Sequence, residues 1–421
     1  MKEYDIVVIG GGPAGLAAAY SAKENGIDSI LIIERDNILG GILNQCIHNG
    51  FGLHVFKEEL TGPEYAEKYA DLVEEENIEY ILNSMVLSVD ENKVVTVMNE
   101  EDGIFEIQAK AVILAMGCRE RTRGAINIPG YRPSGVFSAG MVQRLMNMEG
   151  YIPGKEVVIF GSGDIGLIMA RRMALEGAKV KAVVERKPYS SGLQRNIVQC
   201  LDDYDIPLLY QHTVSKVVGK DRMEGVVLSK VDDKKQAIPG TEEFVSCDTL
   251  LLSVGLIPEN EISRDLGVEM NRKTSGPIVG ENLMTNIEGV FACGNVLHVH
   301  DLVDHVTMES NIAGKKAAEY IKMDKVDTSG KKIQLLAEKG VSYVVPDHIN
   351  LSTLTDDVTV RFRVTDVYEG AYIDVNFDDE LAIHRKKPIL APGEMQEIKL
   401  KKDYILEHQN TDNITFKVEA K

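Results

Sequence analysis

The sequence predicts an α/β fold in which two Rossmann-like dinucleotide-binding domains are followed by a small C-terminal all-β domain. Three observations carry this prediction. A short apolar strand, a glycine-rich turn, a helix, a second strand and an acidic residue follow one another over residues 5–34. The same order recurs over residues 156–185. From about residue 323 the pattern changes to short strands of alternating apolar and polar residues, separated by turn residues.

The first copy of the pattern begins close to residue 1. Residues 5–9 form an apolar run rich in β-branched side chains, and a second strand over 29–33 ends on Glu34, which can accept hydrogen bonds from ribose hydroxyls. The first glycine of the turn permits a tight bend, the second admits a pyrophosphate, and the third lets the helix pack on the strand. Phosphates then lie at the positive end of the helix. The turn residues expected to bind the dinucleotide are Gly10, Gly12, Pro13, Ala14 and Gly15.

The second copy repeats this arrangement with the same spacing. The strand over 156–160 leads into a glycine turn and a helix, and a second strand over 180–184 ends on Glu185, which lies 19 residues after the third glycine, as in the first copy. One glycine motif alone is weak, but two in the same context strongly favour dinucleotide binding. The expected binding residues of this turn are Gly161, Gly163, Asp164, Ile165 and Gly166.

Further elements are expected between and after the two copies. Buried strands over 111–116 and 249–254 close on Gly117 and Gly255, and a strand over 285–295 precedes a helix over 306–321. The tail is expected to be a β sandwich. Its alternating strands cover residues 358–364, 372–377, 397–400 and 414–418.

The composition narrows the classes of partner and the cellular location. The chain has 421 residues with 46 Lys and Arg against 65 Asp and Glu, a net charge of −19, which disfavours nucleic acid and anionic membrane as main partners. No run approaches the ~20 apolar residues of a membrane-spanning helix, so direct membrane insertion is not expected. Five cysteines without a C-x-x-C pair fit a reducing compartment, and we expect a cytoplasmic protein.

The two glycine motifs, the strands ending at Gly117 and Gly255, and the segment Thr-x-x-x-Gly-Val-Phe-Ala-Cys-Gly-Asn over 285–295 resemble a known superfamily. It comprises the FAD-dependent, pyridine nucleotide-disulfide oxidoreductase-like proteins with two dinucleotide-binding domains, and the likeness covers about residues 1–322. The resemblance implies an FAD domain into which an NAD(P) domain is inserted. The implied division is 1–118 with 250–322 for FAD, 119–249 for NAD(P), and 323–421 for the β domain.

The resemblance also implies which residues contact each cofactor. FAD would be held by the first motif and Glu34, together with Arg35, Gly41, Ile42, Ala115, Gly117, Gly294 and Asn295. Asn295 stands where the family carries Asp, and its amide can still bind a ribityl hydroxyl. The nicotinamide dinucleotide would be held by the second motif, Glu185, Arg186 and Gly255. Glu185 favours NAD(H), because a 2′-phosphate would meet a like charge, while Arg186 and Lys187 keep NADP(H) open.

A narrower likeness is to the subgroup that lacks a redox dithiol. The segments Cys118-Arg-Glu-Arg121, Pro129-Gly130, 135–140 and 153–155 resemble α-type subunits of sarcosine and opine oxidases and the flavoprotein that accompanies glycerol-3-phosphate dehydrogenase-like proteins. Residues 40–46 hold one cysteine where disulfide reductases hold two. This likeness implies hydride transfer between NAD(H) and a second redox partner, which would be a companion dehydrogenase of glycerol-3-phosphate or amine type or another electron-transfer protein. The possibility of a homo-oligomer stays open.

Cys46 and His48 are the candidate catalytic residues. A thiolate at Cys46 beside the flavin would suit a stand-alone NADH oxidase or peroxidase, with His48 as acid or base. The alternative is that Cys46 is a small packed side chain and His48 a hydrogen-bonded loop residue. A third possibility, of another class, is a non-catalytic nucleotide-binding interaction protein.

The segment His298-Val-His300-Asp301-Leu-Val-Asp304-His305 contains metal-ligand residue types. Two pairs, His300 with Asp304 and Asp301 with His305, would share helix faces. The segment lies where a helix should direct its positive end at the flavin, which stabilises a reduced flavin without a metal. We therefore expect no metal site, and we expect these side chains to line a substrate face or a partner interface.

Overall fold

The computed structural model describes residues 1–323 and 329–419. By its internal contacts the chain divides into two compact units, 1–118 with 258–421, and 119–257. The chain passes between them through two short strands that pair, β9 (Cys118–Glu120) and β18 (Leu256–Pro258). The predicted division into three domains stays a prediction.

The first unit is built on a seven-stranded sheet. Its central strands are parallel, with Val8 of β1 opposite Ile32 of β2 on one side and Ile113 of β8 on the other. The segments 6–9, 30–33 and 111–114 of these strands are buried, and they are continuous apolar runs, as expected for parallel strands covered on both faces. The parallel strands are β1 (Lys2–Ile9), β2 (Ile30–Ile33), β5 (Glu79–Ile81), β8 (Gly103–Leu114) and β19 (Val290–Ala292), and β6 (Met85–Val89) and β7 (Val94–Asn99) extend the sheet antiparallel.

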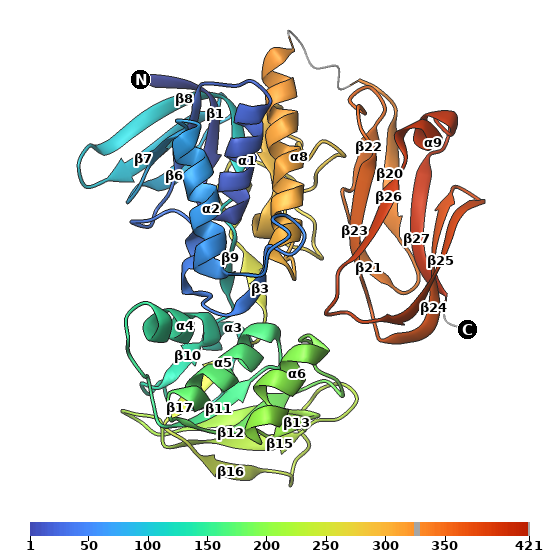
Figure 1. The fold of residues 1–421 in the computed structure, drawn as a ribbon. Helices are drawn as coiled ribbons and strands as arrows, with labels where there is room; N and C mark the ends of the chain where they lie inside the picture. Colours follow the sequence, from blue (N-terminus) through green and yellow to red (C-terminus); the bar gives the residue numbers. More distant parts are fainter. Residues whose placement is uncertain (324–328, 420–421) are drawn as a thin grey trace. The chain divides into compact units, whose positions relative to one another are not determined.

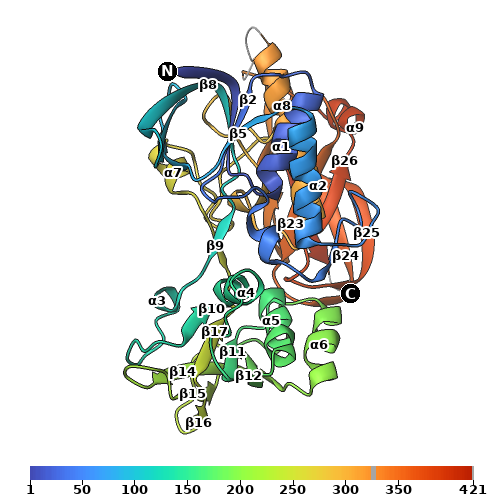
Figure 2. The same ribbon diagram turned by 60° about the vertical axis from the view of Figure 1, so that its left-hand side comes forward.

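Three helices run side by side along this sheet, α1 (Pro13–Glu24), α2 (Gly62–Glu75) and α8 (Val303–Lys322) (Figures 1 and 2). The alanine-rich face of α1 lets α8 come very close, and a Cβ on Gly314 would lie 2.1 Å from the Ala18 carbonyl oxygen. Around the helices lie η1 (Gly41–Gln45), β3 (Asn49–Phe51), β4 (Leu60–Thr61), α7 (Glu261–Asp265) and η3 (Gly294–Val296).

The second unit carries its own five-stranded parallel sheet. Strand order is β10–β17–β11–β12–β13, so that β11, which leads into the second glycine motif, is central. These strands are β10 (Val136–Ser138), β11 (Glu156–Phe160), β12 (Lys179–Glu185), β13 (Leu208–Tyr210) and β17 (Thr249–Leu252); the helices are α3 (Arg123–Ile126), α4 (Ala139–Asn147), α5 (Asp164–Leu175), α6 (Gln194–Cys200) and η2 (Asp202–Tyr204). An antiparallel sheet of β14 (His212–Val218), β15 (Gly225–Lys230) and β16 (Glu243–Ser246) adds to the unit.

The C-terminal segment forms a β domain of two sheets, in which all strand pairs except β20 with β27 are antiparallel. One has the order β22–β20–β27–β24–β25 and the other β21–β23–β26, and they enclose a core that includes Phe362 and Phe416. The strands are β20 (Lys332–Ala337), β21 (Val341–Val345), β22 (His348–Asn350), β23 (Val358–Val364), β24 (Tyr368–Phe377), β25 (Glu380–Leu390), β26 (Gln396–Leu400) and β27 (Asn413–Glu419). The short helix α9 (Lys402–Glu407) is the one departure from an all-β domain among the described residues.

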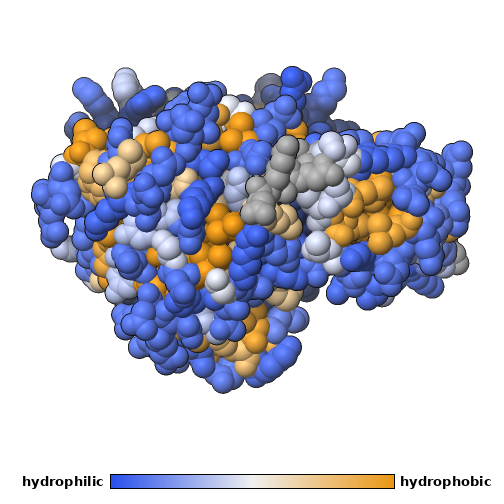
Figure 3. Space-filling model, turned by 90° about the horizontal axis from the view of Figure 1, so that it is seen from above, coloured by the Kyte–Doolittle hydropathy of each residue, from blue (hydrophilic) through white to orange (hydrophobic). Residues whose placement is uncertain are grey.

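The predicted fold class is confirmed, and the differences are local. The strand expected over 111–116 is the end of the longer β8, and the helix expected over 306–321 starts three residues earlier as α8. Of the strand expected over 285–295 only β19 forms, because Thr285 and Ile287 are held in a turn by the Thr285 side chain. No helix in the described part of the chain is long and apolar enough to cross a membrane. The face seen in Figure 3 is mainly hydrophilic, with small separate apolar patches.

Candidate functional site

The first glycine motif joins the carboxyl end of β1 to the start of α1. Gly10 has a φ of +108°, and a Cβ on it would lie 2.5 Å from the Ala115 carbonyl oxygen. A Cβ on Gly15 would lie 1.8 Å from the Gly10 oxygen, so the third glycine is required for packing. Gly12 differs, because the nearest atom to its Cβ position is the Gly41 Cα at 3.9 Å. The second glycine therefore keeps open the space at the helix N-terminus.

The start of α1 suits a pyrophosphate. Its N-cap is Gly12 with no side-chain cap, Pro13 occupies the first turn, and that turn carries no acidic residue. The first amide groups and the positive helix end are thus available to an anion.

The structure brings most of the residues predicted to contact FAD to one edge of the sheet. Three close approaches join separate segments: Gly10 to Ala115, Gly12 to Gly41, and Ala14 to Gly294, whose missing Cβ would lie 2.7 Å from the Ala14 Cβ. This gathering follows from topology, because the parallel strands β1, β8 and β19 all end at this edge. Arg35 and Ile42 directly follow Glu34 and Gly41 in the sequence, and both side chains are exposed.

Glu34 and Glu185 have the same surroundings, one in each unit. The Glu34 carboxylate accepts the Gly11 N–H at 2.6 Å and the Asp36 N–H at 2.8 Å. The Glu185 carboxylate accepts the Ser162 N–H at 3.1 Å and the Lys187 N–H at 3.0 Å. Each acid is buried and held by the second residue of its own glycine motif and by the residue two places after it.

The second glycine motif gathers around Ser253, which follows β17. A Cβ on Gly161 would lie 1.9 Å from the Ser253 oxygen, and a Cβ on Gly166 would lie 2.8 Å from the Ser253 Cβ, whereas the nearest atom to a Cβ on Gly163 is 3.5 Å away. The N-terminus of α5 has no side-chain cap on Gly163. Gly255, with a φ of +103°, lies two residues beyond Ser253 and is approached by Arg121.

Asp164 and Arg186, two residues predicted to bind the nicotinamide dinucleotide, form hydrogen bonds with other parts of the protein. Asp164 places an acid in the first turn of α5, but its Oδ1 accepts the Leu193 N–H at 2.8 Å and the Asn196 amide at 2.6 Å. Its charge is thus directed at the segment after β12. Arg186 is exposed, with one hydrogen bond to the Lys235 carbonyl.

The candidate catalytic pair lies just after η1. Cys46 is half-buried, and its thiol donates to the Ile42 carbonyl oxygen at 3.3 Å. His48 is half-buried and lies against the Phe51 ring, with 5.0 Å between ring centroids. The structure thus gives each of them a local partner within the same loop.

The histidine-rich segment is largely internal, which corrects the expectation of a substrate face or partner interface. His298, His300 and Asp304 are at most 8% exposed. Asp304 accepts the N–H groups of Gly52, His54 and Val55 at 2.8–3.1 Å and so fixes that loop. The predicted pairing across a helix face is also wrong: α8 begins at Val303, because the Asn295 side chain accepts the His300 N–H and holds the preceding segment outside the helix.

Glu309 lies at the centre of this segment. Its Oε1 accepts the Gly294 N–H at 2.9 Å, and its Oε2 lies 2.8 Å from His298 Nε2 and 3.2 Å from Arg361 Nη1. Burial opposes ionisation of Glu309, but the interactions with His300 and His298 outweigh it and bring its pKa well below the ordinary value. Burial lowers the pKa of His298 to about 4. Arg361, on β23, also donates to Glu397 at 2.6 Å.

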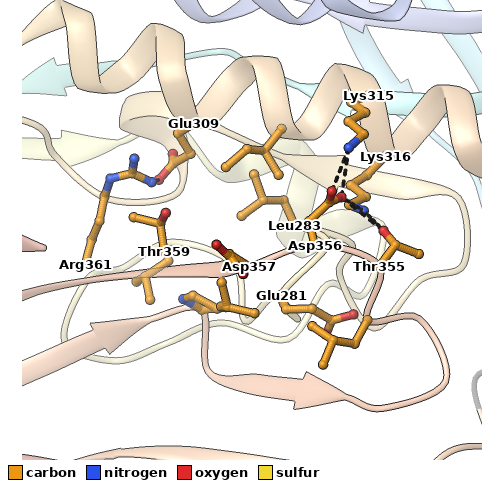
Figure 4. Close-up of a pocket in the computed structure, with 15 residues that line it drawn as sticks. Glu281, Leu283, Glu309, Lys315, Lys316, Thr355, Asp356, Asp357, Thr359 and Arg361 are labelled. Carbon is orange, nitrogen blue, oxygen red and sulfur yellow. Dashed lines mark hydrogen bonds and ion pairs between the residues drawn. The ribbon is translucent and has the colours of Figure 1, made fainter. Parts of the chain in front are cut away.

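A cavity of about 110 Å³ lies beside this cluster, and none of the residues predicted to bind a cofactor lines it. Glu309 and Arg361 stand at one end of it, and Lys315, Lys316 and Asp356 at the other (Figure 4). The two lysines form ion pairs with Asp356 at 2.9 and 2.7 Å. The charges around the cavity are therefore mostly paired with one another.

The sequence does not reveal the residues that contact the predicted sites but lie far from them along the chain. Glu309, which binds the Gly294 N–H, reads in the sequence as an ordinary polar residue of a helix. Ser253 and Arg361 likewise do not belong to a recognisable sequence motif. Ser162 shows a partial signal, because it occupies the second position of the glycine motif, where its hydroxyl donates to Glu185 at 2.6 Å.

Known proteins are similar to this chain over the same region. The family model described as pyridine nucleotide-disulphide oxidoreductase matches residues 4–317. The hydrogen cyanide synthase subunit HcnB of Pseudomonas protegens is 27% identical, over 64% of this chain and 60% of the relative. An opine oxidase subunit of Agrobacterium tumefaciens is 24% identical, over 75% and 63%. This chain thus spans less than two thirds of either relative, whereas it covers 94% of a Listeria monocytogenes thioredoxin reductase at 26% identity over 76% of this chain.

Solved structures show the same fold. Thioredoxin reductase of T. acidophilum matches with a TM-score of 0.63 at 23% identity, covering 76% of this chain and 99% of that one. A bacillithiol disulfide reductase from Bacillus cereus matches with a TM-score of 0.61 at 19% identity, covering 76% and 99%.

Proposed function

Because the chain belongs to the pyridine nucleotide-disulphide oxidoreductase family, we propose that it is the FAD- and NAD(H)-binding subunit of a larger oxidoreductase. Enzymes of this family use FAD and NAD(P)H. In the proposed reaction hydride passes between NAD(H) and FAD, and electrons pass between FAD and a companion subunit. The companion is proposed to be a dehydrogenase acting on glycerol 3-phosphate or an amine.

The residues at the edge of the first sheet fit FAD. Gly12 leaves the space in front of α1 open, the helix end offers unpaired amides, and Glu34 lies where a ribose would arrive. When bound, FAD supplies a flavin that exchanges hydride with a nicotinamide. The work of this chain is to hold the two cofactors, with Gly163 and the start of α5 as the proposed second cradle.

The single observation that carries the choice against disulfide reduction is the placement of the cysteines. Disulfide reduction needs two thiols that can form a bond with each other, and no disulfide joins any two of the five cysteines, all of which lie in the described part of the chain. Burial raises the pKa of Cys200, and raises the pKa of Cys247 and Cys293 to about 12, so these three are poor nucleophiles. The other two thiols have different partners: the Cys46 thiol donates to the Ile42 carbonyl oxygen, and the Cys118 sulfur accepts from the Asn295 amide at 3.6 Å.

The proposal of a companion rests on the names of two relatives, each of which is one subunit of a larger enzyme. The preference for NAD(H) rests on Glu185, whose buried carboxylate would repel a 2′-phosphate. The exposed Arg186 is the residue that would favour NADP(H) instead.

An acceptor assay tests the proposal. With NADH supplied, we expect the purified protein to reduce an artificial dye that accepts electrons from reduced flavin. We expect it to leave thioredoxin-type and small-molecule disulfides unreduced. Turnover of a disulfide at a rate comparable to the dye would overturn the choice. We expect NADPH to be the poorer donor, and Arg186→Ala to weaken any NADPH reaction more than the NADH reaction.

A single variant distinguishes this proposal from the alternative of a stand-alone NADH oxidase or peroxidase. That function needs the Cys46 thiolate, so Cys46→Ser would abolish NADH-driven consumption of oxygen or peroxide. Our proposal expects Cys46→Ser to leave the dye reduction intact, consistent with a thiol that donates to the Ile42 carbonyl.

A further inference from the structure

Three potential metal ligands converge in the interior of the first unit. His298 and His300 lie on the segment between η3 and α8, and Glu309 lies on α8. One ligand atom from each lies within 4.8 Å of the others, and their exposed fractions are 0, 8 and 1%. Two imidazoles and a carboxylate form a donor set that divalent first-row metals prefer.

A second observation points to a missing occupant. Among residues 1–323 and 329–419, His298 Nδ1, both ring nitrogens of His300 and His305 Nδ1 are buried without a hydrogen-bond partner. His300 Nε2 lies 3.3 Å from Glu309 Oε2 without hydrogen-bonding geometry. Buried polar atoms are nearly always satisfied, so several unsatisfied nitrogens in one cluster call for a bound group.

We propose that His298, His300 and Glu309 bind a divalent transition-metal ion, with Zn²⁺ as the best match. Tetrahedral ligation at Zn–N and Zn–O distances of ~2.0–2.1 Å places ligand atoms about 3.3 Å apart. The contact of His300 with Glu309 already has this length, at 3.3 Å, and the contact of His298 with Glu309, at 2.8 Å, needs to open by about half an ångström.

The surroundings supply the outer support that metal ligands need. The Gly294 N–H and Arg361 Nη1 both donate to Glu309 and fix the direction of its carboxylate. Arg361 is shared with Glu397, so two carboxylates face one guanidinium. The cluster therefore keeps one negative charge in excess, which a cation would offset.

The ion would have a structural role. Asn295 is predicted to contact FAD, and the ion would link the segment that follows it to α8. Through the contact between Glu309 and Arg361, the same site would be linked to β23 of the β domain. This inference does not depend on the proposed function, because none of the three ligands belongs to either glycine motif and metal binding requires neither cofactor.

Metal content measured on the full-length protein tests the proposal. Protein stripped with a chelator and then titrated with ZnCl₂ is expected to bind about one Zn²⁺ per chain and to unfold at a higher temperature. His300→Gln is the key variant, because the His300 ring has no hydrogen bond to lose among the described residues, and Glu309→Gln keeps an acceptor for the Gly294 N–H. Both are expected to lose the Zn²⁺.

The matched control is His348→Gln, which alters a half-buried histidine of β22 outside the cluster and is expected to keep the Zn²⁺. Circular dichroism establishes that each variant is folded, and flavin content is measured separately from metal content. The proposal is overturned if stripped wild-type protein binds no Zn²⁺ at micromolar concentrations. It is equally overturned if a folded His300→Gln protein binds as much Zn²⁺ as wild type.

Discussion

At the scale of single residues, the three glycines of each motif do different work. Gly10 and Gly15 are required by the backbone, because any Cβ there would overlap a carbonyl oxygen. Gly12 has ordinary extended geometry, with a φ of −78°, and nothing close to its Cβ position. A side chain at Gly12 would therefore meet the cofactor before it met the protein.

This difference predicts two outcomes for the same substitution. Gly12→Ala is expected to leave the fold intact and to weaken FAD binding about tenfold or more, because the methyl group occupies the space left for the pyrophosphate. Gly15→Ala is expected to destabilise the fold itself. Thermal unfolding and FAD titration measure the two effects, and equal FAD affinity in Gly12→Ala and wild type would show that the pyrophosphate lies elsewhere.

Asp347, in the turn between β21 and β22, gives a pH-dependent prediction. Burial raises its pKa to about 6, and one carboxylate oxygen has no hydrogen-bond partner within the described ranges. A raised pKa means that the folded state holds the proton more tightly than the unfolded state. The ionised side chain thus costs stability as the pH rises from the ordinary pKa of 3.8 through 6, and the full cost persists above that.

Asp347→Asn removes this cost while keeping the acceptor for the Asn271 amide. We expect the variant to be more stable than wild type by about 1–3 kcal/mol at pH 8, and by clearly less at pH 5. Urea unfolding at both pH values measures the difference. Exposed Asp233→Asn serves as the control, and a gain that is the same at both pH values would contradict the assignment.

At the scale of elements, the sequence predicts the strands and turns that are determined by residues close to one another along the chain. The strand over 156–160 appears with the predicted bounds, because an apolar run beside a glycine turn has few alternatives. The glycines and acids of the two predicted cofactor sites could be named for the same reason. The pairing of Arg361 with Glu309 joins residues 52 positions apart and could not be named, because it exists only after β23 lies beside α8.

This pairing predicts the effect of removing one partner. Arg361→Met leaves Glu309 buried and without its guanidinium, which is expected to cost about 3–5 kcal/mol of unfolding free energy. Adding Glu309→Gln to the variant is expected to recover part of the loss, because the buried charge is then removed. Lys417→Met, which breaks an exposed ion pair with Glu419, is the control and is expected to change little. Equal stability of Arg361→Met and wild type would show that β23 does not depend on this contact.

At the scale of the whole molecule, the chain combines a family fold over residues 4–317 with a β domain beyond it. The sequence motifs predict the fold and the class of cofactor. They do not predict the companion, because a docking surface is assembled from residues that share no local pattern. The β domain is tied to α8 through Arg361 and to Asp301 through Arg363, so its attachment falls beside the segment that follows Asn295.

Anaerobic titration of the purified protein with NADH is the most direct measurement of the whole account. We predict a yellow protein with about one FAD per chain, whose visible flavin absorption is bleached by about one equivalent of NADH. A protein that stays colourless when refolded with FAD, or a bound flavin that NADH leaves oxidised, would contradict it.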